Sequence, residues 1–197
     1  MACKIIAVLG SPLTGGNTAK LLDQAIQGAK DSGCDVEKIE VINLDFEACM
    51  EMMFCRENQT CTIDDAMQEI YPKFREADGF IIASPVMTMG IPGRLKSFMD
   101  RFQVFFMAKY FRKASLVPKE LRKKRKGLFI SIAGMNIPNV FDGAKLTMEA
   151  FFDIIDCKYT DELLVNDMDT IRDVTARPDL MKNAYEKGSA LGKSLEG

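Results

Sequence analysis

The feature that most constrains the fold of this chain is an alternation of short apolar runs and amphipathic helical segments. Residues 5–9, 80–83 and 128–132 are almost entirely apolar, which is typical of parallel strands covered on both faces. Residues 36–44 and 162–165 predict two further strands, the first of them more polar and therefore nearer an edge. Apolar residues with helical spacing predict the intervening helices over residues 18–32, from residue 64 onward, and over 92–107, 145–155 and 178–194.

Strand and helix alternate five times, which predicts an α/β fold with a doubly wound five-stranded parallel sheet. The 197 residues correspond to about one domain. We therefore expect a single domain over residues 1–197, with a loop rich in Cys and Met at 45–63 and an insertion at about 104–125. Pro72 lies inside the second helical segment and is expected to kink or shorten it. Ligands of such sheets bind beyond the carboxyl ends of the strands, so the loops after strands one, three and four are the candidate site.

The residue types that are missing restrict the chemistry. The chain has no His, which excludes Ser–His and Cys–His catalysis and His-ligated zinc. It has no Trp, so stacking on a ligand must come from other side chains. We therefore expect any catalysis to take its reactivity from a cofactor. The formal net charge of −2 argues against a nucleic-acid-binding surface.

No apolar run approaches the roughly 20 residues of a membrane helix, and residues 5–9 are too short for a signal peptide. We therefore expect a cytoplasmic protein that does not bind membranes. In the cytoplasm, the six Cys are expected to be free, catalytic or metal-binding rather than disulfide-bonded. Cys3, Cys34 and Cys157 flank strands or helix ends and are most simply small buried residues.

The first loop, residues 10–18 (GSPLTGGNT), matches neither GxGxxG nor a Walker loop. It places small residues and hydroxyls directly before a helix, for which Asn17 is a plausible cap. Backbone N–H groups and the helix dipole make such a place a phosphate site. Ser11, Asn17 and Thr18 can add side-chain hydrogen bonds, which favours the single phosphate of a mononucleotide. A turn followed by a helix cap explains the loop equally well.

The loop after the third strand, residues 84–92, contains two prolines that stiffen it and Gly90, which permits an unusual backbone angle. A rigid loop of this kind could bracket a flavin ring with backbone polar groups and soft side chains. An ordinary strand-to-helix turn is the alternative. After the fourth strand, Ala133 and Gly134 have little bulk, which suits close approach of a ring.

Four segments in this order resemble the NAD(P)H-dependent FMN reductases, and within them the iron–sulfur flavoproteins: GSPLTGGNTAKLL, DDAMQEIY, ADGFIIASPVMTMGIPGRLKSFMDRF and FFDIIDCKYTDELLV. The resemblance extends over roughly residues 3–166. It implies a flavodoxin-like sheet of order 2-1-3-4-5 that binds FMN. It places the phosphate against Ser11, Leu13, Gly16, Asn17 and Thr18, and the ring against Pro85, Val86, Met87, Thr88, Met89, Gly90, Ala133 and Gly134. Leu13 replaces the usual basic residue, which leaves only its N–H, and Met87 replaces the usual aromatic residue.

Residues 49–61 (CMEMMFCRENQTC) hold three Cys where the iron–sulfur flavoproteins show C-x2-C-x2-C-x4–7-C. Alignment puts Cys49, Met52, Cys55 and Cys61 at the four ligand places. A 4Fe–4S cluster needs four thiolates, and Met52 is an uncharged thioether. Cys49, Cys55 and Cys61 are tentative metal ligands. Four interpretations stay open: a loop without metal, a cluster with an unusual fourth ligand, a Cu(I) site of Cys and Met, and reversible thiol oxidation.

Residues 98–111 (FMDRFQVFFMAKYF) hold six aromatic residues. Helical spacing explains Phe98 and Phe102 as core. The others exceed what one helix face can bury: Phe105, Phe106, Tyr110 and Phe111. They predict a homodimer or homotetramer interface that also covers the flavin, with an extension of the core as the alternative.

The basic residues 119–126 (KELRKKRK) are most simply a solvated loop, with a site for the NADPH 2′-phosphate as the alternative.

The sequence therefore predicts an FMN-dependent oxidoreductase that transfers electrons from NAD(P)H to a small acceptor such as a flavin, a quinone or an iron centre. The flavin does the chemistry, so no catalytic residue is assigned. Substrate and nicotinamide would meet the ring near Met87, Met89 and residues 49–55. One alternative is a non-enzymatic electron-transfer flavoprotein with FMN, with or without an iron–sulfur cluster. The other is a scaffold that has lost both centres.

Overall fold

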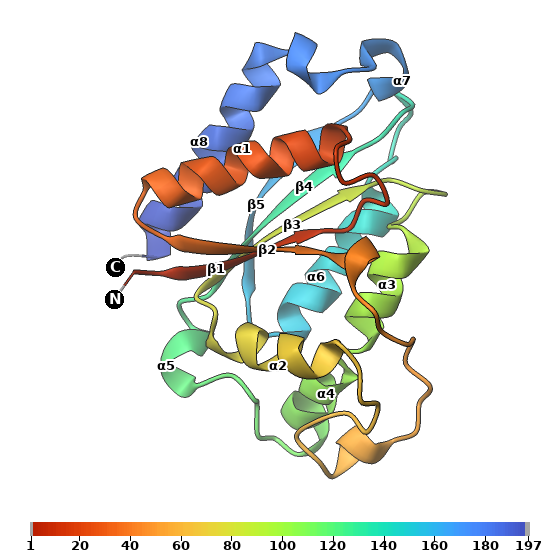
Figure 1. The fold of residues 1–197 in the computed structure, drawn as a ribbon, viewed down its shortest axis with the longest axis vertical. Helices are drawn as coiled ribbons and strands as arrows, with labels where there is room; N and C mark the ends of the chain where they lie inside the picture. Colours follow the sequence, from red (N-terminus) through yellow and green to blue (C-terminus); the bar gives the residue numbers. More distant parts are fainter. Residues whose placement is uncertain (1, 196–197) are drawn as a thin grey trace.

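The protein forms a five-stranded parallel sheet in the order β2-β1-β3-β4-β5 (Figure 1), seen in a computed structural model that describes residues 2–195. The strands are β1 (Lys4–Leu9), β2 (Asp35–Glu40), β3 (Gly79–Pro85), β4 (Lys126–Ile132) and β5 (Lys158–Val165). Each neighbouring pair runs parallel. The predicted α/β class and strand order are confirmed, and the order is that of a flavodoxin-like fold.

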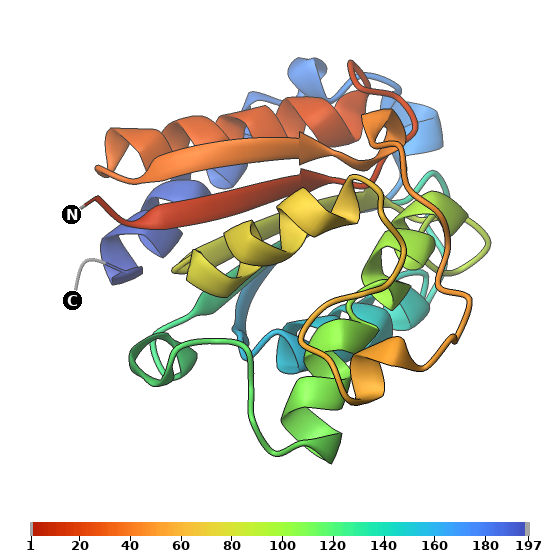
Figure 2. The same cartoon turned by 60° about the horizontal axis from the view of Figure 1, so that its bottom comes forward.

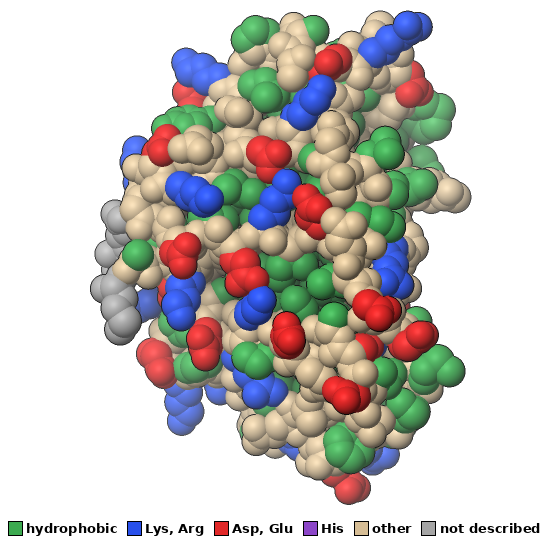
Figure 3. All heavy atoms as spheres, in the orientation of Figure 1, with side chains coloured by type: hydrophobic (Ala, Val, Ile, Leu, Met, Phe, Trp, Pro, Cys, Tyr) green, Lys and Arg blue, Asp and Glu red, His purple; other side chains and the backbone are tan. Residues whose placement is uncertain are grey.

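Helices cover both faces of the sheet (Figures 1 and 2). One face carries α1 (Asn17–Asp31) and α8 (Pro178–Leu195), and the other carries α2 (Met67–Glu76), α3 (Gly93–Asp100) and α6 (Asp142–Ile154). The short helices are η1 (Val41–Asn43), η2 (Phe54–Arg56), α4 (Gln103–Phe106), the π-helix η3 (Met107–Phe111), α5 (Lys119–Arg122), α7 (Met168–Ile171) and η4 (Val174–Ala176). Alternate residues of β1 enter two separate apolar cores, with Ala7 on the α1 side and Val8 on the α2 side. On the face shown in Figure 3, acidic and basic side chains are interspersed.

The predicted apolar strands lie where expected, but some boundaries differ. The second strand ends at Glu40, because residues 41–43 turn into a 3₁₀ helix that buries Val41. Helix α2 begins at Met67 rather than at residue 64, because the carboxylate of Asp65 accepts the N–H of Met67 (3.0 Å). Pro72 is expected to kink or shorten this helix, but it does not end it, because α2 continues to Glu76. Ile70, Tyr71 and Phe74 are buried on both sides of the proline, and this packing offsets the missing hydrogen bond.

The helix predicted over residues 92–107 is broken in two. Pro92 precedes α3 as its N-cap, and α3 ends at Asp100. Arg101, which is 1% exposed, turns back to pair with Asp65, and the chain restarts as α4 and η3. Phe105 is 1% exposed and packs on Phe102, so for this residue the alternative of an extension of the core is correct. Phe111 does stay exposed.

Arg125 contradicts the interpretation of residues 119–126 as a solvated loop. Its side chain is fully buried and donates hydrogen bonds to the carbonyl oxygens of Ala77 (2.9 Å), Ile155 (2.6 Å) and Phe74. Its guanidinium also lies over the ring of Phe80. Burial lowers the pKa of Arg125 to about 10. This arginine therefore ties β4 to the connections that precede β3 and β5.

The expectation that Cys3 and Cys34 are free is wrong, because the two form a disulfide with their Cα atoms 4.6 Å apart. The pairing of Lys4 with Asp35 in the β1–β2 ladder brings the preceding residues side by side. Cys157 is free and buried, and burial raises the pKa of its thiol to about 12.

Between residues 2 and 195, none of the helices has the length and apolar character needed to cross a membrane.

The double variant Cys3→Ser/Cys34→Ser is expected to lose roughly 3–4 kcal/mol of unfolding free energy, because the disulfide closes a loop and so lowers the conformational entropy of the unfolded chain. Urea unfolding under oxidising conditions measures this loss. With dithiothreitol present, wild type and variant should unfold together. Equal stability without reductant would contradict the disulfide.

Candidate functional site

The sheet's hydrogen bonding continues beyond the strands into the three loops at its carboxyl edge. The N–H of Gly10 donates to Ala83 O (2.8 Å), and the N–H of Val86 donates to Ile132 O (2.7 Å). The N–H of Ala133 donates to Val165 O (2.8 Å). The loops that carry the candidate cofactor residues are therefore held side by side at one edge, as Figure 1 shows on its right.

The first loop folds around Ser11, which is 5% exposed. Ser11 Oγ accepts the N–H of Leu13 (3.1 Å), and Leu13 O accepts the N–H of Gly16 (3.2 Å). The Leu13 N–H, which the resemblance assigns to a phosphate, is therefore already bonded within the loop. The Leu13 side chain is exposed to solvent.

Helix α1 begins directly behind this loop. Its N-cap is Gly16 and not Asn17, which is the first helical residue. The helical ladder starts with the N–H of Lys20, which donates to Gly16 O (3.0 Å). The three preceding N–H groups, of Asn17, Thr18 and Ala19, have no acceptor inside the helix. Together with the dipole of a 15-residue helix, they fit a phosphate group.

Asn17 has side-chain partners that the sequence does not indicate. Its Nδ2 donates to Arg172 O (2.7 Å), and its Oδ1 accepts the N–H of Val174 (3.0 Å). The amide is therefore engaged with a segment more than 150 residues away. Only the backbone N–H of Asn17 is left for a phosphate.

The loop after β3 is a tight hairpin. The N–H of Met87 donates to Gly90 O (2.9 Å), and the N–H of Gly90 donates to Met87 O (3.1 Å). The two residues between them, Thr88 and Met89, have φ angles of 50° and 61°. The expectation that Gly90 takes the unusual angle is wrong, because two residues with side chains take it instead. Each costs about 1–2 kcal/mol of backbone strain.

Neighbouring elements hold this hairpin and the loop after β4. A Cβ on Gly143 would lie 2.3 Å from Met89 O, so the first turn of α6 abuts the hairpin. On the other loop, Asp169 donates its N–H to Gly134 O (3.0 Å). A Cβ on Gly134 would lie 2.5 Å from Asp169 Oδ1. A carboxylate therefore stands beside the position where the resemblance places a ring, a contact that the sequence does not indicate.

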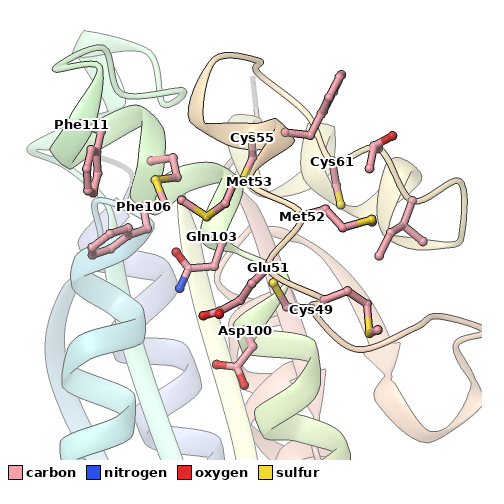
Figure 4. A pocket seen from close by; sticks show the side chains of 15 residues that line it. Cys49, Glu51, Met52, Met53, Cys55, Cys61, Asp100, Gln103, Phe106 and Phe111 are labelled. Atoms are coloured by element: carbon pink, nitrogen blue, oxygen red, sulfur yellow. The ribbon is translucent and has the colours of Figure 1, made fainter.

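The three candidate metal ligands line a separate cavity of about 710 Å³ (Figure 4). The cavity is lined by Cys49, Met50, Glu51, Met52, Met53, Phe54, Cys55, Cys61, Thr62, Ile63, Asp100, Gln103, Phe106, Met107 and Phe111. Burial raises the pKa of the Cys55 thiol, and the nearby Cys61 and Cys49 raise it further.

The donor set of this cavity does not fit a four-thiolate cluster. Within residues 2–195, three or more Cys, Asp or Glu side chains do not converge in a group suited to a metal ion. The second ligand place is Met52, whose side chain is 53% exposed and carries no charge.

A buried ion pair between Arg101 and Asp65 holds together the two ends of the segment that carries these cysteines. Arg101 donates to both carboxylate oxygens of Asp65 and to Glu47 O (2.7 Å), while Asp65 Oδ2 accepts the N–H of Glu47 (3.0 Å). Burial alone would raise the pKa of Asp65, but these hydrogen bonds outweigh it and hold the pKa below its ordinary value. Arg112 also donates to the carbonyls of Cys55 and Arg56. The segment 47–65 is therefore fixed at both ends and in the middle.

The cavity and the carboxyl-edge loops lie at opposite ends of α3. The hairpin 86–90 precedes Gly93, and the cavity reaches Asp100 at the other end. Eight helical residues span about 12 Å. Met87 and Met89 do not line this cavity. The expectation that substrate and nicotinamide meet the ring near Met87, Met89 and residues 49–55 therefore stays a prediction.

This arrangement of fold and loops has a counterpart among known proteins. The model of the NADPH-dependent FMN reductase family matches residues 3–137. The chain belongs to that family. It is 39% identical over 98 residues to an iron-sulfur flavoprotein of Methanosarcina thermophila, a match that covers 50% of this chain and 51% of that protein. A second iron-sulfur flavoprotein, from Methanocaldococcus jannaschii, is 37% identical over the same length, with the same coverage of both chains.

The chain thus spans about half the length of the curated relatives that it matches. Among solved structures, an FMN-dependent NADH-azoreductase from Bacillus anthracis, in complex with FMN, superimposes with a TM-score of 0.70. It is 18% identical, and the match covers 99% of this chain and 100% of that chain. At this identity the likeness shows a shared fold. The family match includes the loops after β1 and β3, Ala133 and Gly134 after β4, and the cysteine segment, and it ends before residues 166–177.

The variant Met52→Cys is expected to gain a cluster, because it completes the four-thiolate spacing. After anaerobic treatment with ferrous iron and sulfide, it should take up about four iron and four sulfide ions per chain, counted chemically. Met50→Cys adds a thiol to the same cavity at the wrong spacing and is the matched control. Wild type that already takes up four irons would show that three thiolates suffice.

Proposed function

We propose that this family member is an FMN-dependent oxidoreductase that takes hydride from NAD(P)H and passes the electrons to a small acceptor such as a free flavin, a quinone or an iron centre. The observation that carries the proposal is the phosphate-type site at the start of α1: unpaired helix N–H groups beside the buried Ser11 and Thr18. The family match and the FMN of the azoreductase support it.

In this proposal, the backbone N–H groups of residues 17–19 and the Thr18 hydroxyl hold the phosphate. The Ser11 hydroxyl, which donates to Leu13 O (3.2 Å) in this structure, turns from that carbonyl to the phosphate. The hairpin 86–90 and the backbone of Ala133 and Gly134 fix the position of the ring. When bound, FMN supplies the redox chemistry, since it accepts a hydride and returns electrons singly or in pairs. The chain contributes binding and orientation, and its lack of His is consistent with that division.

Met87 and Met89 would border the approach to the ring. Both are about half exposed, and their thioethers are soft and adaptable. The hairpin that carries them is strained and tightly hydrogen-bonded, so their backbone positions are well defined. Donor and acceptor would enter over these two side chains. The cysteine cavity is not required for this reaction.

The purified chain is expected to release about one FMN on denaturation and to lose its flavin absorption on anaerobic addition of NADH or NADPH.

A charge introduced at Gly15 tests the phosphate site, because a Cβ there meets no atom within 4 Å. Gly15→Glu places a carboxylate at the phosphate site and should weaken FMN binding about 10-fold or more, whereas Gly15→Gln should bind like wild type.

A chain that binds no FMN would refute the proposal. A chain that binds FMN but oxidises nicotinamide slowly, while exchanging electrons quickly with a reduced protein partner, would instead be an electron carrier.

The proposed enzyme is a homodimer or homotetramer. Phe111 is 53% exposed beside the cysteine cavity, and Tyr110 is 37% exposed, which is unusual for side chains of this size on a monomer. Light scattering should give two or four copies, and Phe111→Ser should shift the equilibrium toward smaller species. A wild-type monomer at high concentration would contradict this part of the proposal.

A further inference from the structure

The segment 166–177 lies outside the family match and covers the start of α1. Its backbone at Arg172 and Val174 binds both ends of the Asn17 amide, with hydrogen bonds of 2.7 and 3.0 Å. Asp173 adds an ion pair to Lys20, in the first turn-and-a-half of the same helix (2.8 Å). Three consecutive residues of this segment therefore adjoin the helix end that the proposed function assigns to a phosphate.

Arg172 stands at the centre of this contact in a strained conformation. Its φ and ψ angles are 62° and −49°, and the N–H of Asp173 donates back to Ile171 O (2.7 Å). This is the rare form of the γ-turn, which side chains usually avoid. The N–H of Arg172 is fixed by Met168 O (2.8 Å), and its carbonyl is fixed by Asn17. The backbone of this arginine is therefore held beside α1 from both sides.

The charges around the site leave Arg172 without a counterion. Residues 10–16 (GSPLTGG) carry no charged side chain. Lys20 is paired with Asp173, and Arg177 is paired with Asp179 (2.7 Å). The Arg172 side chain is exposed, and its guanidinium has no hydrogen bond or ion pair with residues 2–195. The backbone of this unpaired arginine adjoins the phosphate-type site through its hydrogen bond with the Asn17 side chain.

We propose that Arg172 binds the terminal phosphate of FMN and supplies the positive charge that the first loop lacks. Arg172 lies outside residues 3–137, the part of the chain that the family model matches. This inference rests on the proposed function. A guanidinium can donate two parallel hydrogen bonds to a phosphate, which a lysine cannot reproduce. The strained turn holds the backbone of Arg172 beside the start of α1, and Asn17 is the positioning residue that fixes the turn.

The test compares two flavins that differ only in the phosphate. Apoprotein is titrated with FMN and with riboflavin, and quenching of flavin fluorescence gives each Kd. Arg172→Ala should raise the Kd for FMN about 10- to 100-fold, because charge-assisted hydrogen bonds are lost, and should leave the Kd for riboflavin unchanged. Arg172→Lys should recover part of the loss. Arg177→Ala removes the same charge five residues away and should bind both flavins like wild type.

The outcomes separate this inference from the proposed function. If Arg172→Ala weakens both flavins equally, the residue has a structural role only and the assignment is wrong. The assignment is equally wrong if neither Kd changes while wild type binds FMN tightly, and the proposed function then stands. A wild-type chain that binds neither flavin overturns both. Salt provides a second readout, because FMN binding by wild type should weaken with ionic strength more steeply than binding by Arg172→Ala.

Discussion

The parallel hydrogen-bond ladder across β1, β3, β4 and β5 determines where this protein can do chemistry. The ladder does not stop at the strand ends. It includes the first N–H group of the loops after β1, β3 and β4, at Gly10, Val86 and Ala133. The loops therefore begin at positions set by backbone geometry, whatever their sequences. Variation in the loops changes what is bound, and the sheet keeps the place of binding constant.

The sequence predicted this framework because its signals are local. The apolar runs of β1, β3 and β4 and the spacing of α8 can be read within a few residues, and the strand order followed from the resemblance. The errors have long-range causes. Helix 92–107 breaks because Arg101 pairs with Asp65, 36 residues away. Cys3 meets Cys34 through strand pairing. No local pattern reports either contact.

In the candidate site, too, the local features could be predicted from the sequence and the long-range contacts could not. Hydroxyls and glycines before a helix are visible in sequence, so the phosphate-type loop could be found. The partner of Asn17 could not, because residues 172 and 174 follow α7, a short helix that the sequence did not predict, and no local pattern links them to Asn17. The left-handed angles at Thr88 and Met89 were also hidden, since neither residue is a glycine. In the hairpin, the cross-strand hydrogen bonds and the α6 contact oppose the local preference.

The buried Arg101–Asp65 pair also bears on how such a protein can change over generations. It secures the 47–65 segment through Glu47, and Arg112 secures its middle, so the exposed side chains between these anchors are not needed to hold the segment. Position 52 is one of them, with half of its surface in solvent. A substitution there alters the donor atoms of the cavity without disturbing the fold. The donor atoms of the cavity can therefore change by substitution while the loops at the carboxyl edge of the sheet keep their positions.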